Sequence, residues 1–317
     1  MPVVGFSLPP MKDSLFDRAE RTGAIPEAFQ DIRDNKALLD FMAEYQPSAV
    51  IHMAAQPLVL ESYLNPRKTF ETNVMGTVNV LDCSFKTDSI KVVIVVTTDK
   101  VYRNDDSGRP FIESDPLSGK DPYSASKVGT ESVVAAWQQI AKVSGGAKVI
   151  SARAGNVIGG GDFAVNRLVP DIIRGLTAGT SIQIRNPDST RPWQHVLDPL
   201  TGYLKLLEKT IDGSTFIESM NFGPEHESLT VSQVLKIFEA SWAKRINRNI
   251  VKDKSNAETQ ILQLDSNYAR NELEWTPKWT QEDAVRATAR WWDSVINKEI
   301  SPLKASKLDI AYLLNEA

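Results

Sequence analysis

A tyrosine and a lysine stand four residues apart in the segment DPYSASK, at Tyr123 and Lys127. On a helix this spacing puts both side chains on one face. A tyrosine has an ordinary pKa of about 10, and a nearby ammonium group favours its phenolate form. The pair therefore predicts a proton-transfer site with Tyr123 as the base and Lys127 lowering its pKa. An ordinary pair on a helix surface is the alternative.

Polar residues directly follow a short buried strand earlier in the chain. Residues 92–96 read VVIVV, a continuous β-branched run that is typical of a strand covered on both faces of a parallel sheet. The sequence TTDK follows at 97–100. Open α/β sheets bind ligands at the carboxyl ends of their strands. We therefore expect the TTDK segment to face Tyr123.

Strand and helix patterns alternate through the first half of the chain. We expect strands within residues 1–8, 28–34, 46–56, 92–96 and 148–156, and helices at 35–45, 66–86 and 123–142. This alternation predicts parallel pairing and an α/β, doubly wound (Rossmann-like) sheet. Shorter mixed elements follow and indicate a smaller lobe over the sheet. We divide the chain into 1–155 and 156–317, with some later segments returning to the first domain.

Composition excludes several classes of protein. The 317 residues are 42% hydrophobic and carry a net charge of −4, without the basic stripe that nucleic-acid binding needs. No apolar run approaches the roughly 20 residues that span a bilayer, so we expect no membrane segment. The single cysteine, Cys83, fits a core position and a reducing cytoplasm. His52, His195 and His226 are scattered, which gives no metal-ligand spacing.

Eight motifs, spread over nearly the whole chain, carry a family resemblance. They are, in order, GFSLPP, DIRD, HMAAQPLV, TTDK, YSASK, ARAGNVIGGGDFAVNRLVPDIIRG, RPWQHVLDPLTGYL and MNFGP. The chain resembles the extended short-chain dehydrogenase/reductases (the NAD-dependent epimerase/dehydratase family), and among them the CDP-glucose 4,6-dehydratases. Two features narrow the resemblance to the CDP-glucose 4,6-dehydratases. One is TDK in place of the TDE of thymidine-linked enzymes, and the other is RPWQHV. Leu60 departs from the pattern, since arginine is usual there.

The resemblance implies an NAD-dependent lyase that converts CDP-glucose to CDP-4-keto-6-deoxyglucose for deoxysugar biosynthesis, as in lipopolysaccharide. It implies that Tyr123 takes the proton of the C4 hydroxyl, that Thr98 hydrogen-bonds O4, and that Asp99 is the acid toward the C6 hydroxyl. Lys127 would also reach the nicotinamide ribose. Lys100 occupies the position of a glutamate base in the thymidine-linked enzymes. Its ordinary pKa of about 10.4 is high for a base, and a solvated loop charge is the alternative.

The resemblance also assigns binding residues. The residues expected at the NAD cofactor are Asp31, Ile32, Ala54, Ala55, Gln56, Tyr123 and Lys127. Asp31 and Ile32 would contact adenine, and a surface turn is their alternative role. The residues expected at the sugar nucleotide are Asn156, Arg167, Leu168, Val169, Arg191 and His195. Arg167 and Arg191 would meet the diphosphate, which suits their planar forks. Asn73 is expected to tie the helix to the sheet, and a homodimer through residues 66–86 and 123–142 is expected.

One part of the family pattern is not found. No glycine-rich phosphate loop precedes GFSLPP. The GGGD at 159–162 follows the strand at 148–156, which is the sixth strand when the missing first strand is counted, so it cannot replace that loop. We therefore expect a doubly wound sheet that lacks its first strand, a truncated dinucleotide-binding domain over 1–155, weak NAD binding and impaired activity. One alternative is a non-catalytic remnant that binds sugar nucleotides or dimerises. An NAD-dependent sugar-nucleotide epimerase is another, against which TTDK argues.

Overall fold

Four parallel strands form the main sheet, in the order β10-β5-β4-β3. Their bounds are Ala49–His52 for β3, Val92–Val96 for β4, Lys148–Ala154 for β5 and Ser219–Phe222 for β10. In the register, Val92 of β4 lies opposite Ala49 on one side and Lys148 on the other. The parallel α/β sheet that the alternating pattern predicts is therefore confirmed.

This computed structural model describes residues 2–105, 107–184, 186–213, 217–225, 228–250 and 262–315, and His226 lies outside them. Within these ranges, no helix combines the length and the apolar character that crossing a membrane requires.

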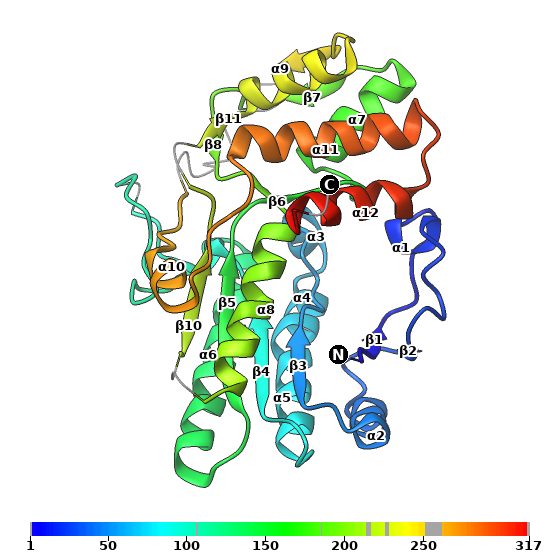
Figure 1. Ribbon diagram of the computed structural model, residues 1–317. Coiled ribbons are helices and arrows are strands. Elements are labelled where there is room, and N and C mark those ends of the chain that lie inside the picture. The colour runs from blue at the N-terminus through cyan, green and yellow to red at the C-terminus, as the bar shows by residue number, and fades with distance from the viewer. Residues whose placement is uncertain are drawn as a thin grey trace.

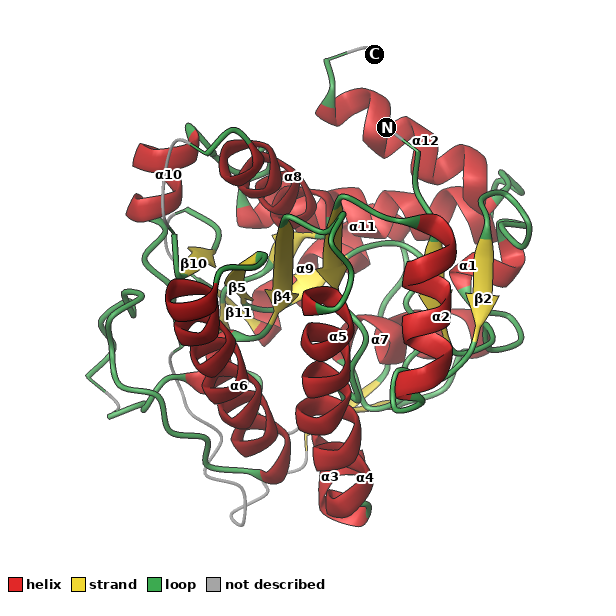
Figure 2. Cartoon of the chain, turned by 90° about the horizontal axis from the view of Figure 1, so that it is seen from below, coloured by secondary structure: helices red, strands yellow, loops and turns green. Residues whose placement is uncertain are grey.

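Helices cover both faces of the main sheet (Figure 1, Figure 2). On one face lie α2 (Asn35–Tyr45), α5 (Gly76–Phe85) and α6 (Pro122–Ser144), and on the other lies α8 (Leu197–Ile211). Because successive side chains of a strand point to opposite faces, β4 contributes to two cores. Val93 and Val95 pack with residues of α2, α5 and α6, whereas Val92 and Ile94 pack with residues of α8 and β10. A run buried on both faces is the reason why β4 is uniformly apolar.

The helix expected at 66–86 is continuous but not uniform. It consists of α4 (Pro66–Phe70), a π-helical turn η1 (Glu71–Met75) and α5. A shorter helix that the sequence does not predict, α3 (Val59–Leu64), precedes it. Asn65 stands at the N-cap of α4, as expected, but its side chain makes no capping hydrogen bond there. Its Nδ2 donates instead to Glu61 Oε1 at 2.8 Å, because Asn65 also ends α3.

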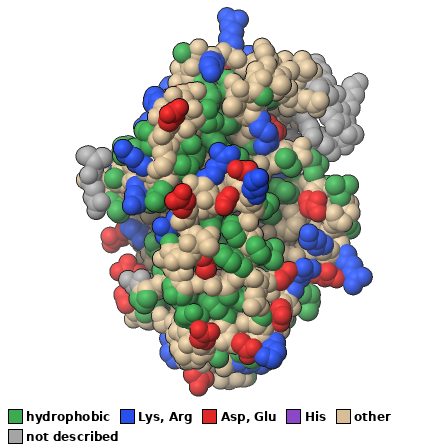
Figure 3. Space-filling view, turned by 90° about the vertical axis from the view of Figure 1, so that its right-hand side faces the viewer, with side chains coloured by type: hydrophobic (Ala, Val, Ile, Leu, Met, Phe, Trp, Pro, Cys, Tyr) green, Lys and Arg blue, Asp and Glu red, His purple; other side chains and the backbone are tan. Residues whose placement is uncertain are grey.

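The first two strands form a sheet of their own. β1 (Gly5–Ser7) pairs in parallel with β2 (Glu27–Phe29), and α1 (Leu15–Arg18) lies between them in the chain. The doubly wound order places one more strand between β1 and β3, and no strand of the described residues lies there. Hydrophobic side chains gather in the middle and lower parts of the face that carries α1, β1, β2 and α12 (Figure 3). Charged side chains surround them.

A second group of elements forms the upper part of the molecule (Figure 1). Its helices are α7 (Leu168–Ala178), α9 (Val231–Trp242), α11 (Gln281–Ile296) and α12 (Pro302–Leu313). Its short strands are β6 (Val157–Ile158), β7 (Ile182–Ile184), β8 (Thr190–Arg191), β9 (Gln194–His195), β11 (Leu229–Thr230) and β12 (Arg248–Ile250). Val285 and Trp292 of α11 are buried in its core.

Several later elements pack on the main sheet. They are α8 and α10 (Asn267–Leu273), while β10 is itself a strand of that sheet, and the side chains of Tyr203, Phe222 and Trp275 join these elements in one core with Ile94. A division of the chain at residue 155 stays a prediction, with these elements as segments that return to the first domain.

Candidate active site

The amino end of α6 places Tyr123 beside the polar segment that follows β4. Asp121 caps this helix through a reciprocal pair of hydrogen bonds with Ser124, which fixes where the first turn begins. Thr98 in turn caps the short 3-10 helix η2 (Asp99–Val101). The side chain of Thr98 and the charge of Asp99 both act on the phenol of Tyr123. The structure thus brings the catalytic candidates of α6 and of TTDK together.

The phenol of Tyr123 differs from its sequence-based expectation. Burial raises the pKa of Tyr123 to about 12, although the hydrogen bond with Thr98 opposes this rise. The expected lowering by Lys127 is not found, because the ammonium group of Lys127 is directed elsewhere. Its Nζ donates to the carbonyl of Val96 at 3.0 Å. The four-residue spacing places Tyr123 and Lys127 on one face of α6, but it does not determine the direction of the Lys127 side chain.

Lys127 itself is strongly perturbed. It is 6% exposed, and burial lowers its pKa to about 8, while the carboxylate of Glu131, one turn further along α6, opposes this shift. The charge of Lys127 also contributes to a low pKa for His52. A lysine of this kind is partly deprotonated near neutral pH, which places it among the groups typical of functional sites.

Asp99 is the buried carboxyl of the site. It is 1% exposed, and burial raises its pKa against the opposing effects of Lys100, Thr98 and Arg191. Its Oδ1 accepts a hydrogen bond from Thr98 Oγ1 at 3.0 Å, whereas its Oδ2 has no partner among the described residues. Gly155 leaves room for this oxygen, since a Cβ there would lie 3.0 Å from Oδ2. A buried carboxyl with a raised pKa and one oxygen without a partner suits a general acid.

Two of the expected substrate residues lie near these groups. The positive charge of Arg167 acts on Tyr123, and that of Arg191 acts on Asp99. Arg167 also pairs with Asp162 at 3.2 Å. Both expected diphosphate ligands are therefore within electrostatic range of the catalytic candidates, and their role as ligands stays a prediction.

Other expected substrate residues are structural neighbours of the site. Val169 is 4% exposed in the upper core, and Leu168 packs against the same core. Asn156 accepts a hydrogen bond from the backbone of Gln194 through its own carbonyl. His195 is 1% exposed, and its ring lies 4.2 Å from that of Trp279. Its role as a substrate ligand stays a prediction.

The expected cofactor residues follow the carboxyl ends of β2 and β3. Arg33 forms an ion pair with Asp31 at 2.7 Å and holds the pKa of that carboxyl below its usual range. A pocket of about 470 Å³ lies here, lined by Asp31, Arg33, Glu71, Met75 and Asn79. Ile32 is 7% exposed and its carbonyl accepts a hydrogen bond from Asn79, so adenine could meet only its backbone.

The loop after β3 is held by a buried amide pair. Ala54 and Ala55 are partly buried there. The backbone N–H of Gln56 donates to Asn73 Oδ1 at 2.8 Å, and Asn73 Nδ2 donates to the carbonyl of Gln56 and to Ser126. Asn73 lies in the π-helical turn, a feature common at functional sites. The structural role predicted for Asn73 is confirmed, since it joins this loop to α6.

A second pocket was missed by sequence reasoning. It has a volume of about 410 Å³ and is lined by Pro110, Pro192, Pro224, Glu225, Ser228, Gln263, Leu264, Asp265, Arg270 and Gln281. Pro192 in the pocket wall lies near the catalytic segment. Gly155 is next to both, since a Cβ added to it would lie 3.2 Å from Pro192 and 3.0 Å from Asp99. Its walls come from segments that are distant in sequence. Of its lining residues, Pro192 belongs to the motif RPWQHV and Pro224 to the motif MNFGP.

The fold and the site define a short-chain dehydrogenase/reductase. The profile of the GDP-mannose 4,6 dehydratase family matches residues 17–288, and a CDP-glucose 4,6-dehydratase of Salmonella typhimurium is 37% identical over 98% of this chain and 88% of the relative. The chain belongs to this family of 4,6-dehydratases. A dTDP-glucose 4,6-dehydratase of Escherichia coli is 27% identical over 85% of this chain and 79% of its own.

Solved structures agree with this fold. A double mutant of dTDP-glucose 4,6-dehydratase from Streptomyces venezuelae, with NAD and DAU bound, matches with a TM-score of 0.76 and 26% identity, over 90% of this chain and 84% of that chain. UDP-glucose-4-epimerase from Stenotrophomonas maltophila, with bound NAD, matches with a TM-score of 0.79 and 19% identity, over 94% and 100% of the two chains.

Proposed function

We propose that this chain is an NAD-dependent CDP-glucose 4,6-dehydratase, a carbon-oxygen lyase of deoxysugar biosynthesis in the cytoplasm. The observation that carries the proposal is the contact of Tyr123 with the segment of Thr98 and Asp99, in which one carboxyl oxygen of Asp99 has no partner among the described residues. A simple epimerase needs no such second acid beside its tyrosine. The relative from Salmonella typhimurium supports the choice of a CDP-linked substrate.

The described residues offer sites for the two nucleoside ends of a nicotinamide dinucleotide, but no glycine-rich loop for its pyrophosphate lies among them, so we expect NAD to bind weakly. The pocket beside Asp31 has a volume of about 470 Å³, within the range of small-molecule sites. Asp31, the backbone of Ile32, Ala54, Ala55 and Gln56 would hold its adenosine end, and Tyr123 and Lys127 its nicotinamide ribose. A nicotinamide held there would supply the hydride acceptor for oxidation at C4 and the hydride donor for reduction at C6.

The protein side chains would move the protons of the same reaction. Tyr123 takes the proton of the C4 hydroxyl, and Thr98 holds O4. The C4 ketone makes the C5 proton acidic, and Lys100 is the candidate that removes it. Asp99 gives its proton to the C6 hydroxyl, which leaves as water. A proton then returns to C5, so that the sugar loses one water in total and the redox balance is neutral.

The sugar nucleotide would extend from this site past Pro192 into the pocket of about 410 Å³. Arg191 and Arg167 would meet the diphosphate, because their charges already act on Asp99 and Tyr123. Arg270, which pairs with Glu225 at 3.3 Å in the pocket wall, offers a further hydrogen-bond donor for the nucleoside.

A homodimer through α3 to α5 and α6 is part of the proposal. These helices expose large apolar side chains, namely Tyr63, Leu64, Phe70, Met75, Ile140 and Val143. Large exposed apolar side chains favour protein association. Sedimentation of the purified protein, compared with a Leu64→Glu variant, should show a dimer that the charge weakens. A monomer in both would refute this part alone.

The activity is tested with purified protein, NAD and CDP-glucose, followed by mass spectrometry. We expect a product lighter by one water with a carbonyl at C4. Parallel reactions with dTDP-glucose and GDP-mannose should be slower, since the proposal assigns a CDP-linked substrate. An isomer of unchanged mass would identify an epimerase, and unchanged CDP-glucose at saturating NAD would favour a non-catalytic binding protein.

A further inference from the structure

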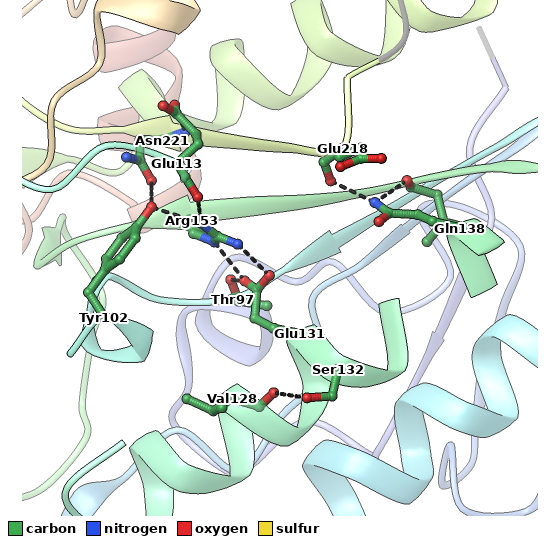
Figure 4. A network of polar contacts seen from close by, with 11 residues as sticks. Thr97, Tyr102, Glu113, Val128, Glu131, Ser132, Gln138, Arg153, Glu218 and Asn221 are labelled. Atoms are coloured by element: carbon green, nitrogen blue, oxygen red, sulfur yellow. Dashed lines mark hydrogen bonds and ion pairs between the residues drawn. The ribbon is translucent and has the colours of Figure 1, made fainter. Parts of the chain in front are cut away.

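A buried ion pair lies behind the candidate site. Arg153 of β5 and Glu131 of α6 form two parallel hydrogen bonds, with Nε to Oε1 at 2.9 Å and Nη2 to Oε2 at 2.8 Å (Figure 4). Their side chains are 6% and 5% exposed. Burying two charges is costly, and replacing such a pair with apolar residues is often neutral or stabilising. We therefore expect the Arg153–Glu131 pair to have a role beyond stability.

The ion pair is bonded to both ends of the catalytic segment. Before Thr98, the hydroxyl of Thr97 donates to Glu131 Oε1 at 2.5 Å. After η2, Arg153 Nη1 donates to the hydroxyl of Tyr102 at 2.8 Å, and that hydroxyl donates to Asn221 Oδ1 at 2.7 Å. Figure 4 shows these side chains converging from the sheet and from α6. Thr98 and Asp99 thus lie on a short segment that is fixed at each end.

The same carboxylate belongs to the surroundings of Lys127. Tyr123, Lys127 and Glu131 follow one another at four-residue steps along α6, on one face. The groups around the ammonium are Glu131 on its own helix, His52 on β3 and the carbonyl of Val96 on β4. Glu131 is the one carboxylate among these groups, so it favours the charged form of Lys127.

We propose that Glu131 and Arg153 are positioning residues of the reaction: together they hold residues 97–102 against α6, so that Thr98 and Asp99 stay opposite Tyr123, and the carboxylate of Glu131 keeps Lys127 charged. The inference rests on the proposed function for its kinetic consequences. The alternative is an ordinary ion pair that only joins α6 to the sheet.

Two variants separate the two parts of this role. Glu131→Gln keeps the shape of the side chain and removes its charge, so Lys127 loses the carboxylate that opposes its deprotonation. Because the ammonium form is lost as the pH rises through its pKa, the alkaline limb of kcat should move to lower pH by one unit or more. Tyr102→Phe leaves these charges in place and removes the two hydrogen bonds of the hydroxyl, with Arg153 and with Asn221, so kcat should fall about tenfold without a move of the limb.

Gln138→Met is the matched control. Gln138 also joins α6 to the sheet, since its Nε2 donates to the carbonyls of Val149 at 2.9 Å and Glu218 at 2.8 Å (Figure 4). It has no contact with residues 97–102 among the hydrogen bonds of the described chain. In this variant Tm should fall, whereas kcat and its pH profile should stay as in the wild type.

Hydrogen exchange of the amides in residues 97–102 supplies a readout that does not need activity. We expect faster exchange in Glu131→Gln and Tyr102→Phe than in wild type and Gln138→Met. Wild-type protein without dehydratase activity would refute the proposed function, and the exchange data would then test the positioning role alone. An unmoved pH limb in Glu131→Gln, together with exchange equal to that of Gln138→Met, would overturn the inference, because the ion pair would then only stabilise the fold.

Discussion

Thr98, in the segment that follows β4, interacts with the phenol of Tyr123 at the start of α6, and Asp99 follows Thr98 directly. The two elements are separated in sequence by a long loop, and the parallel sheet brings them together. The proposed base for the C4 hydroxyl and the proposed acid for the C6 hydroxyl therefore lie at one site.

The first prediction concerns Tyr123. In Tyr123→Phe the ring still fills its buried site, but no group remains to take the proton of the C4 hydroxyl. We expect kcat to fall by about 10²–10⁴, the usual contribution of a general base, with a nearly unchanged KM. Tyr203→Phe is the control, since Tyr203 is equally buried in the core under α8. A normal kcat in Tyr123→Phe would remove this residue from the mechanism.

The second prediction concerns Asp99. Asp99→Asn keeps the shape of the side chain and removes the proton that would go to the C6 hydroxyl. We expect kcat for water loss to fall by about 10²–10⁴. Asp40→Asn, at an exposed carboxyl in an i,i+4 pair with Lys36, should leave the rate unchanged. Equal rates in the two variants would contradict the assignment of Asp99 as the acid.

The third prediction concerns the pH dependence of activity. Burial lowers the pKa of Lys127 to about 8 and raises that of Asp99. In the proposed reaction Asp99 is an acid and the ammonium group of Lys127 lies at the nicotinamide ribose, so both groups act in their protonated forms, and both lose them as the pH rises. We expect kcat to fall on the alkaline side, with a limb near pH 8 that is measurable in steady-state assays. A rate that keeps rising through pH 10 would show that neither protonated form is required.

The fourth prediction concerns stability in acid. Burial lowers the pKa of His52 to about 3, so between about pH 6.5 and 3 the unfolded chain binds a proton that the folded chain does not. The free energy of unfolding should therefore fall as the pH falls, by up to about 1.4 kcal/mol per pH unit from this group. Thermal melts between pH 7 and 4 measure it. In His52→Asn the free energy of unfolding should depend less steeply on pH. An equally steep dependence in this variant would show that another group causes it.

The fifth prediction concerns Gly155. A Cβ at this position would lie 3.0 Å from Asp99 Oδ2 and 3.2 Å from Pro192 Cγ, closer than ordinary contacts. Gly155→Ala should displace one of the two and lower kcat about tenfold or more, whereas Gly5→Ala, where the nearest atom is 3.5 Å away, should not. If both variants retain full activity with unchanged Tm, the space beside Asp99 has no catalytic importance.

Patterns that depend on local periodicity were predicted well. The strand at 92–96 is uniformly apolar because both of its faces are covered, and the helix from Pro122 begins at a capping box and a proline. The site followed from these two elements, since chain order and sheet direction place their ends together. Val285, Ala289 and Trp292 lie at i, i+4 and i+7 of α11, and they likewise face the core.

Features that depend on tertiary packing were not predicted. The direction of the Lys127 side chain follows from the carbonyl of Val96, a contact that no helical spacing shows. The burial of His195 follows from Trp279 and from α12, a helix that the sequence patterns did not indicate. The second pocket needs five separate segments to meet, so single motifs could mark only parts of its wall.

The central claim is that one site oxidises C4 and loses water across C5 and C6, and an isotope experiment tests it most directly. CDP-glucose carrying deuterium at C4 is incubated with the protein and NAD, and the product is examined by NMR and mass spectrometry. We expect a 4-keto-6-deoxy product with the deuterium at C6, because the hydride removed at C4 returns there. Deuterium that remains at C4 in an isomer of CDP-glucose would contradict the account.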